Sequence, residues 1–92
     1  MSFAIEAGAK VLFTGDSITD NGRRGANAPL GAGYVRMVRD LVRAKYPDHN
    51  LTVLNTGIGG HTVLDLAGRW TDDVILHQPD WLSIWVGIND VH

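Results

Sequence analysis

The chain has 92 residues and a formal net charge of −2, and 45% of its residues are hydrophobic against 20% charged. This composition is typical of a folded globular domain, and its small negative charge argues against a general nucleic-acid surface, which would be basic. Cysteine is absent, which excludes disulfides and thiolate metal sites, and no apolar run approaches the roughly 20 residues of a membrane span.

Strands and helices alternate along the first half of the chain. The N-terminal stretch MSFAIEAGAK lacks the basic start and apolar core of a secretory signal, so we expect a cytoplasmic protein. A strand is predicted over 10–14 and a glycine-rich loop over 15–33. A helix is predicted over 34–46, and Pro47 ends it. The helix face expected to meet the core consists of Tyr34, Met37, Val38, Leu41 and Val42.

The second half continues this alternation. A strand over 51–55 leads into a glycine-rich turn, after which a helix is predicted from 63 to about 78. Thr62 is expected to cap this helix, with Asp65 completing a capping box. The last strand, 81–86, has the sequence WLSIWV. A nearly continuous apolar run of this kind is typical of a strand buried on both faces of a parallel sheet.

Three strands alternating with two helices predict an α/β fold, with a doubly wound parallel sheet between helix layers in a three-layer α/β/α arrangement. The β-α-β-α-β order is a portion of such a fold. Its last strand would have an uncovered apolar edge, at which another strand can pair. We therefore expect this edge to be covered by further sequence or by self-association.

Polar residues and glycines follow each predicted strand: GDS at residues 15–17, GIGGHT at 57–62 and GIND at 87–90. The carboxyl ends of parallel strands meet at the edge where α/β sheets bind ligands, so these segments are expected to converge. Taken singly, each has a structural explanation as a turn or a helix cap. Together they provide a serine, backbone N–H groups and an amide, which is the equipment for acyl transfer through an oxyanion.

The three segments, in this order, resemble the first three sequence blocks of the SGNH or GDSL-type hydrolases, with Ile18 where the family name has leucine. The likeness covers about residues 11–90. The sequence QPDWLSIWVGINDV at 78–91 is most similar to the acetylxylan esterases of the carbohydrate acetylesterase branch. The resemblance implies a flavodoxin-like SGNH hydrolase fold, with residues 1–92 as the N-terminal part of a single domain.

The resemblance also implies a role for each matching residue. Ser17 matches the nucleophile, and Gly60 and Asn89 match oxyanion-hole donors, together with the N–H of Ser17. Asp16 and Asp90 match supporting positions. The implied reaction is hydrolysis of carbohydrate O-acetyl esters through an acyl-serine intermediate, with no metal or organic cofactor. The implied partner is a small-molecule or carbohydrate ester, with no nucleic acid and no membrane.

The general base of the family pattern is not found in this chain. The fourth block, an Asp-x-x-His that supplies the base and the group that orients it, does not occur after Asn89. His61 follows Gly60, but it is expected to be a polar residue at a helix entry. A serine hydrolase without one triad member keeps only roughly 10³–10⁴-fold catalysis over water. We therefore expect the 92 residues alone to be inactive or barely active.

Three other functions stay open at this point. GIGGHT follows a strand as a nucleotide- or phosphate-binding turn would, although Thr62 replaces the last glycine of the dinucleotide fingerprint and no P-loop lysine is present. A metal hydrolase would require Asp16, Asp90, His61 and His92 to converge. A non-catalytic interaction fragment would pair with a partner through the apolar strand at 81–86.

Overall fold

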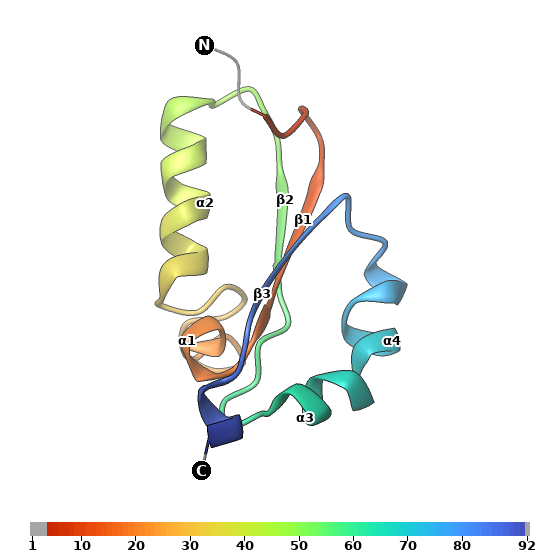
Figure 1. Ribbon diagram of the computed structural model, residues 1–92. Coiled ribbons are helices and arrows are strands. Elements are labelled where there is room, and N and C mark those ends of the chain that lie inside the picture. The colour runs from red at the N-terminus through yellow and green to blue at the C-terminus, as the bar shows by residue number, and fades with distance from the viewer. Residues whose placement is uncertain (1–3, 92) are drawn as a thin grey trace.

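The computed structural model describes residues 4–91, in which a three-stranded parallel sheet lies between helices (Figure 1). The strands are β1 (Lys10–Gly15), β2 (Thr52–Asn55) and β3 (Trp81–Trp85), in the spatial order β2-β1-β3. β1 is therefore the central strand. Phe13 pairs with Asn55 on one side, and Gly15 pairs with Trp85 on the other.

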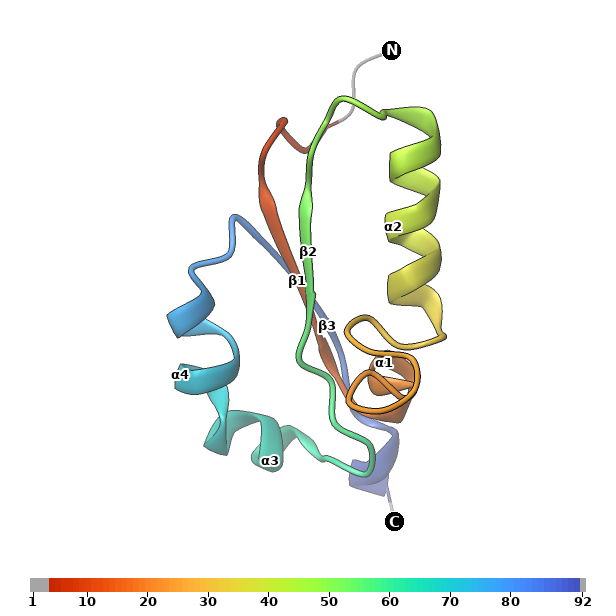
Figure 2. The same cartoon turned by 180° about the vertical axis from the view of Figure 1, so that it is seen from behind.

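Helices cover both faces of the sheet. α2 (Tyr34–Lys45) lies on one face, and α3 (Val63–Gly68) and α4 (Trp70–Asp73) lie on the other, as both views show (Figures 1 and 2). The shorter elements are α1 (Ser17–Asp20) and the 3₁₀ helices η1 (Ile75–His77) and η2 (Ile88–Val91). The predicted doubly wound α/β fold is confirmed. No helix within residues 4–91 is long and apolar enough to cross a membrane.

The core is built around β1. Val11 and Phe13 pack with Leu30 and Val35 on the α2 side of the sheet. Side chains alternate between the faces of a strand, so Leu12, which is fully buried, belongs to the α3 and α4 side. β1 thus leads from the core directly into a polar loop. The buried end of the strand at Gly15 fixes the position at which that loop begins.

The face of α2 that meets the sheet differs from the predicted one. Val35 is completely buried, whereas Met37 is 64% and Leu41 is 68% exposed. The prediction that Met37 and Leu41 face the core is wrong for this chain. Helical periodicity identifies an apolar stripe on the helix. Which residues of the helix are buried depends on how it packs on the sheet, and here Val35 makes the buried contact.

The helix predicted over 63–78 is also wrong, because it is broken into α3, α4 and η1. The predicted capping box of Thr62 and Asp65 at its start is confirmed. Arg69 then leaves helical geometry, with φ −115° and ψ 13°, and Val74 does so again. Gly68 weakens the helix at the first break. The side chain of Arg69 finds partners at the strand ends, which stabilise the interruption.

β3 is exposed in this chain, contrary to the expectation that both of its faces are buried. It pairs with β1 alone among the described strands, and Ile84 and Trp85 are each about half exposed. The uncovered apolar edge that the sequence predicted for this strand is confirmed.

Candidate active site

The polar segments after β1, β2 and β3 lie at one edge of the sheet, and we call them loop one (16–33), loop two (56–62) and loop three (86–91). The start of loop one is bonded to the end of β3, because the Asp16 N–H donates to the Trp85 carbonyl at 3.3 Å. Loop two is bonded to the end of β1, because the Ile58 N–H donates to the Gly15 carbonyl at 3.0 Å. The predicted convergence of the three segments is therefore present.

Glycine is required at position 15 by this arrangement. A Cβ there would lie 1.9 Å from the Trp85 carbonyl oxygen, and the backbone φ is +156°. No side chain fits between β1 and β3 at this point. The close approach of the two strands determines where the following residues, Asp16 and Ser17, are presented.

Ser17 is the first residue of α1 and is exposed. Asp16 caps this helix, since its Oδ1 accepts from the Ile18 N–H at 3.2 Å. Asp16 is fully buried, and its Oδ2 has no partner among the described residues. The first N–H groups of a helix lack acceptors within the helix. Of residues 4–91, none accepts from the Ser17 N–H or bonds its hydroxyl.

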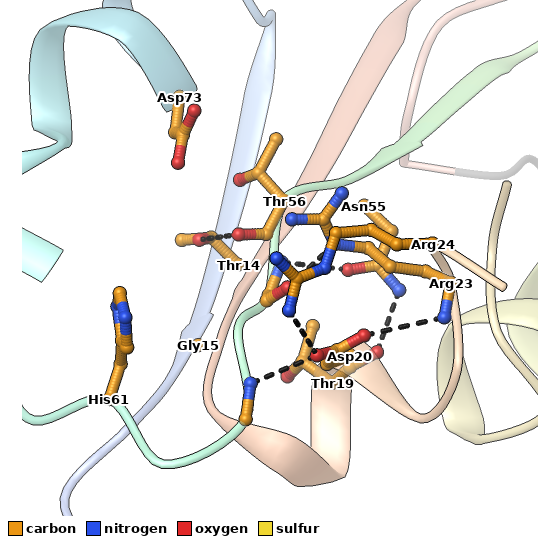
Figure 3. Close-up of polar contacts among 12 residues, drawn as sticks. Thr14, Gly15, Thr19, Asp20, Arg23, Arg24, Asn55, Thr56, His61 and Asp73 are labelled. Atoms are coloured by element: carbon orange, nitrogen blue, oxygen red, sulfur yellow. Dashed lines mark hydrogen bonds and ion pairs between the residues drawn. The ribbon is translucent and has the colours of Figure 1, made fainter. Parts of the chain in front are cut away.

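Loop two is held on either side of Gly60. The Gly59 N–H donates to Asp20 Oδ2 at 2.9 Å, which is one of the dashed lines that meet the Asp20 carboxylate in Figure 3. Asn89 Nδ2 donates to the His61 carbonyl at 3.0 Å. Gly60 itself has φ +82°, with open space where a Cβ would be, and its N–H has no acceptor among the described residues. The anchored loop thus presents one unpaired backbone donor.

Loop three is fastened to the start of α3 as well. Both carboxylate oxygens of Asp90 lie 3.2 Å from the Val63 nitrogen. An amide side chain has two N–H bonds, so Asn89 keeps a second donor after bonding loop two. The edge of the sheet therefore carries an exposed serine hydroxyl and three donors that are unpaired among residues 4–91: the backbone N–H groups of Ser17 and Gly60 and the second amide N–H of Asn89.

His61 is not arranged as a base for Ser17. Its Nδ1 accepts from the Arg69 Nε–H at 3.1 Å, so the neutral ring carries its proton on Nε2. Neither nitrogen then has a free lone pair. Figure 3 shows His61 on the α3 side, apart from the cluster around Asp20. The role of His61 as a polar residue at the helix entry stays a prediction.

Arg69 is a site-forming residue that the sequence analysis missed. Its guanidinium donates to the Gly15 carbonyl at 2.9 Å, to the Thr56 carbonyl and to Asp73 at 2.9 Å. It therefore joins the ends of β1 and β2 beneath the site. Arg69 lies within the helix predicted over 63–78, and no local signal in the sequence shows that this arginine turns inward.

Asn55 was missed in the same way. It is buried at the end of β2, where its Nδ2 donates to the Thr19 carbonyl at 2.6 Å and to the Leu30 carbonyl at 2.8 Å. Its Oδ1 accepts from the Gly57 N–H at 2.9 Å. One amide thus links loop one to loop two, and its place before a glycine turn was the available signal.

Asp20 forms the acidic centre of the site. Burial would raise its pKa, but the N–H groups of Gly59 and Arg23, with the guanidinium charges of Arg24 and Arg23, hold the pKa of this carboxyl below its usual value. It is therefore ionised at neutral pH.

No group of three metal-ligating side chains of the kind that could hold a metal ion occurs among residues 4–91. His92, which the sequence analysis considered as a ligand, lies outside the described residues.

Comparison with known proteins gives consistent matches. The sequence profile of the GDSL-like lipase/acylhydrolase family matches residues 13–92. The acetylxylan esterase of Geobacillus stearothermophilus is 52% identical, in a match covering 95% of this chain and 42% of that protein. A crystal structure of that esterase superposes with a TM-score of 0.91, over 97% of this chain and 43% of the other.

An alpha/beta hydrolase enzyme from the metagenome of Lake Arreo, Spain, is 40% identical with a TM-score of 0.88, over 95% of this chain and 43% of the other. This chain thus spans less than half the length of these relatives. Structures of catalytic mutants of the Geobacillus enzyme also match, in which a serine, an aspartate or a histidine is replaced by alanine.

Proposed function

The chain belongs to the GDSL-like lipase/acylhydrolase family, and on that premise we propose that it carries the nucleophile and the oxyanion-hole donors of a serine esterase. The proposed substrates are O-acetyl esters of carbohydrates. The 52% identity to an acetylxylan esterase supports this substrate class. The observation that carries the proposal is an exposed, unpaired Ser17 beside a loop that is anchored on both sides of a free Gly60 N–H.

In the proposed reaction, Ser17 Oγ attacks the acetyl carbonyl carbon while its proton passes to a general base. The carbonyl electrons move to oxygen, and the resulting oxyanion is stabilised by the N–H groups of Ser17 and Gly60 and by the amide of Asn89. Collapse of this intermediate expels the sugar alkoxide, which takes the proton from the base. Water then hydrolyses the acetyl-serine by the same steps.

The general base is proposed to be a histidine oriented by an aspartate, both outside the 92 residues. Two observations support this. The Geobacillus esterase has catalytic mutants at an aspartate and at a histidine. In the present chain, His61 has its Nδ1 lone pair bonded to Arg69. The 92 residues alone should then hydrolyse an aryl acetate barely above background, and rapid turnover by them would contradict the missing base.

The nucleophile can be tested in a fusion of these 92 residues with the remaining C-terminal part of the Geobacillus esterase, which we call the fusion esterase. Ser17→Ala is expected to lower kcat for an aryl acetate by at least about 10³-fold, because the acyl-serine can no longer form. Ser83→Ala, a serine in β3, is the matched control and should retain activity. Retained turnover in Ser17→Ala would refute the proposed function.

A further inference from the structure

We propose that Asp20 is a positioning residue for this reaction: its carboxylate holds Gly59 in loop two, so that the next N–H, that of Gly60, is aimed at the oxyanion. The inference rests on the proposed function. It gives a role in the reaction to a residue that lies outside the three sequence blocks shared with the family and that makes no hydrogen bond to Ser17.

The geometry places Asp20 between the nucleophile and loop two. It is the last residue of α1 and lies three positions after Ser17, so both project from one side of this single turn. A Cβ on Gly59 would lie 3.6 Å from the Ser17 Cβ and 3.7 Å from Asp20 Oδ2. Gly59 therefore lies within van der Waals reach of both residues.

The Asp20 carboxylate is itself held rigidly. It is only 9% exposed, its Oδ1 accepts from the Arg23 N–H at 3.3 Å, and Arg24 lies 3.5 Å from Oδ2 (Figure 3). The side chain of Arg23 adds a second tie, since its Nε–H donates to the Gly57 carbonyl at 2.6 Å. Loop two is thus fastened to loop one at two points before Gly60.

This arrangement separates two consecutive N–H groups. That of Gly59 is bonded to Asp20, and that of Gly60 has no acceptor among residues 4–91. An oxyanion donor is effective because it is oriented before the reaction, and removing one costs roughly 10²–10³ in kcat. Loss of Asp20 loosens the donor without deleting it, so the expected loss is about 10- to 100-fold in kcat, with KM nearly unchanged.

The kinetic test compares two carboxylates in the fusion esterase. Asp20→Ala should show this loss in kcat for an aryl acetate. Asp65→Ala is the matched control, because Asp65 also accepts from a backbone N–H of loop two, that of Thr62 at 2.9 Å. It lies at the α3 cap, so its loss should leave kcat within about threefold. Equal losses in both variants would overturn the positioning role.

Amide exchange supplies a readout that does not depend on activity. With selectively ¹⁵N-labelled glycine, exchange at the Gly59 amide should be at least about tenfold faster in Asp20→Ala than in the parent fusion, because the hydrogen bond is lost. Ser17→Ala should leave it slow. Fast Gly59 exchange with unchanged kcat would overturn the inference alone, whereas an active Ser17→Ala enzyme would overturn the proposed function alone.

Asp20→Asn covers the case in which the alanine variant does not fold. Its side-chain oxygen can still accept from Gly59. We expect slow exchange at Gly59 and a kcat within about fivefold of the parent, since position rather than charge is the proposed contribution. Slow exchange together with a kcat lowered about 100-fold would overturn the proposal, because the loss would then follow the charge.

Discussion

At the scale of single residues, Gly15 shows how close strand packing excludes a side chain from a position next to the site. The Trp85 carbonyl occupies the place of a Cβ at this position, and that carbonyl also accepts from the Asp16 N–H. The contact is between backbone groups, so no side-chain rotation can relieve a clash. The residue before the nucleophile loop is thus restricted by the neighbouring strand.

Gly15→Ala should therefore lower the free energy of unfolding by about 3 kcal/mol or more, since overpacking against backbone forces the strands apart. Gly68→Ala is the opposite case, because a Cβ at Gly68 meets nothing within 4 Å. It should be neutral or stabilise by up to about 1 kcal/mol by removing a helical glycine. Urea denaturation of both variants of the fusion esterase checks the pair, and similar losses in both would contradict this explanation.

The charge on Asp20 gives a second prediction at this scale. Its folded pKa is lowered, so the ionised group stabilises the fold above its unfolded pKa of about 4, and that contribution is lost as the pH falls through the folded value. Asp20→Asn should flatten the decline in Tm of the fusion esterase between about pH 5 and pH 3. If the Tm of Asp20→Asn fell as steeply with pH as that of the unsubstituted fusion, the lowered pKa of Asp20 would be contradicted.

At the scale of elements, the break between α3 and α4 places a charged side chain against the ends of β1 and β2. Arg69 sits at the break, and its guanidinium bonds the Gly15 and Thr56 carbonyls, Asp73 and His61. Its side chain is only 11% exposed. A buried guanidinium charge is tolerated here because each of its three nitrogens donates a hydrogen bond.

Arg69→Met is expected to destabilise the fusion esterase by about 2–4 kcal/mol, because Asp73 and the strand-end carbonyls lose an enclosed partner. Arg36→Met is the control. Arg36 is exposed and has a single ion pair of 3.9 Å with Asp40, so its loss should cost less than about 1 kcal/mol. Thermal unfolding measures both, and a small effect of Arg69→Met would show that the break does not depend on these bonds.

At the scale of the whole molecule, the two outer strands of the sheet, β2 and β3, each have an edge that no other described strand covers. β1 has two neighbours, but β2 and β3 each have one among the described strands. Side chains of β3, including Leu82 and Ile84, are 38% and 49% exposed. An uncovered apolar edge strand pairs readily with other strands. The coverage of this edge, by further sequence or by another copy, stays a prediction.

The 92-residue chain by itself is expected to self-associate, with a sedimentation profile that shifts to larger species as its concentration rises. Ile84→Lys should shift the profile toward monomer, because a charge on the edge strand opposes pairing. Leu64→Lys adds the same charge on α3, where Leu64 is 81% exposed, and should change the profile little. A parent chain that is monomeric at all concentrations would contradict this expectation.

The sequence by itself determined the alternation of strands with helical segments, the parallel α/β fold and the three segments that meet at the sheet edge, because periodicity, glycine turns and capping residues are local signals. The roles of Ser17, Gly60 and Asn89, and the cytoplasmic location, stay predictions. Only the tertiary structure decided which side chains join the loops. Asp20 meets Gly59 across 39 positions and Arg69 meets Gly15 across 54. Such partners are chosen by the packing of the strands, and no short stretch of sequence records them.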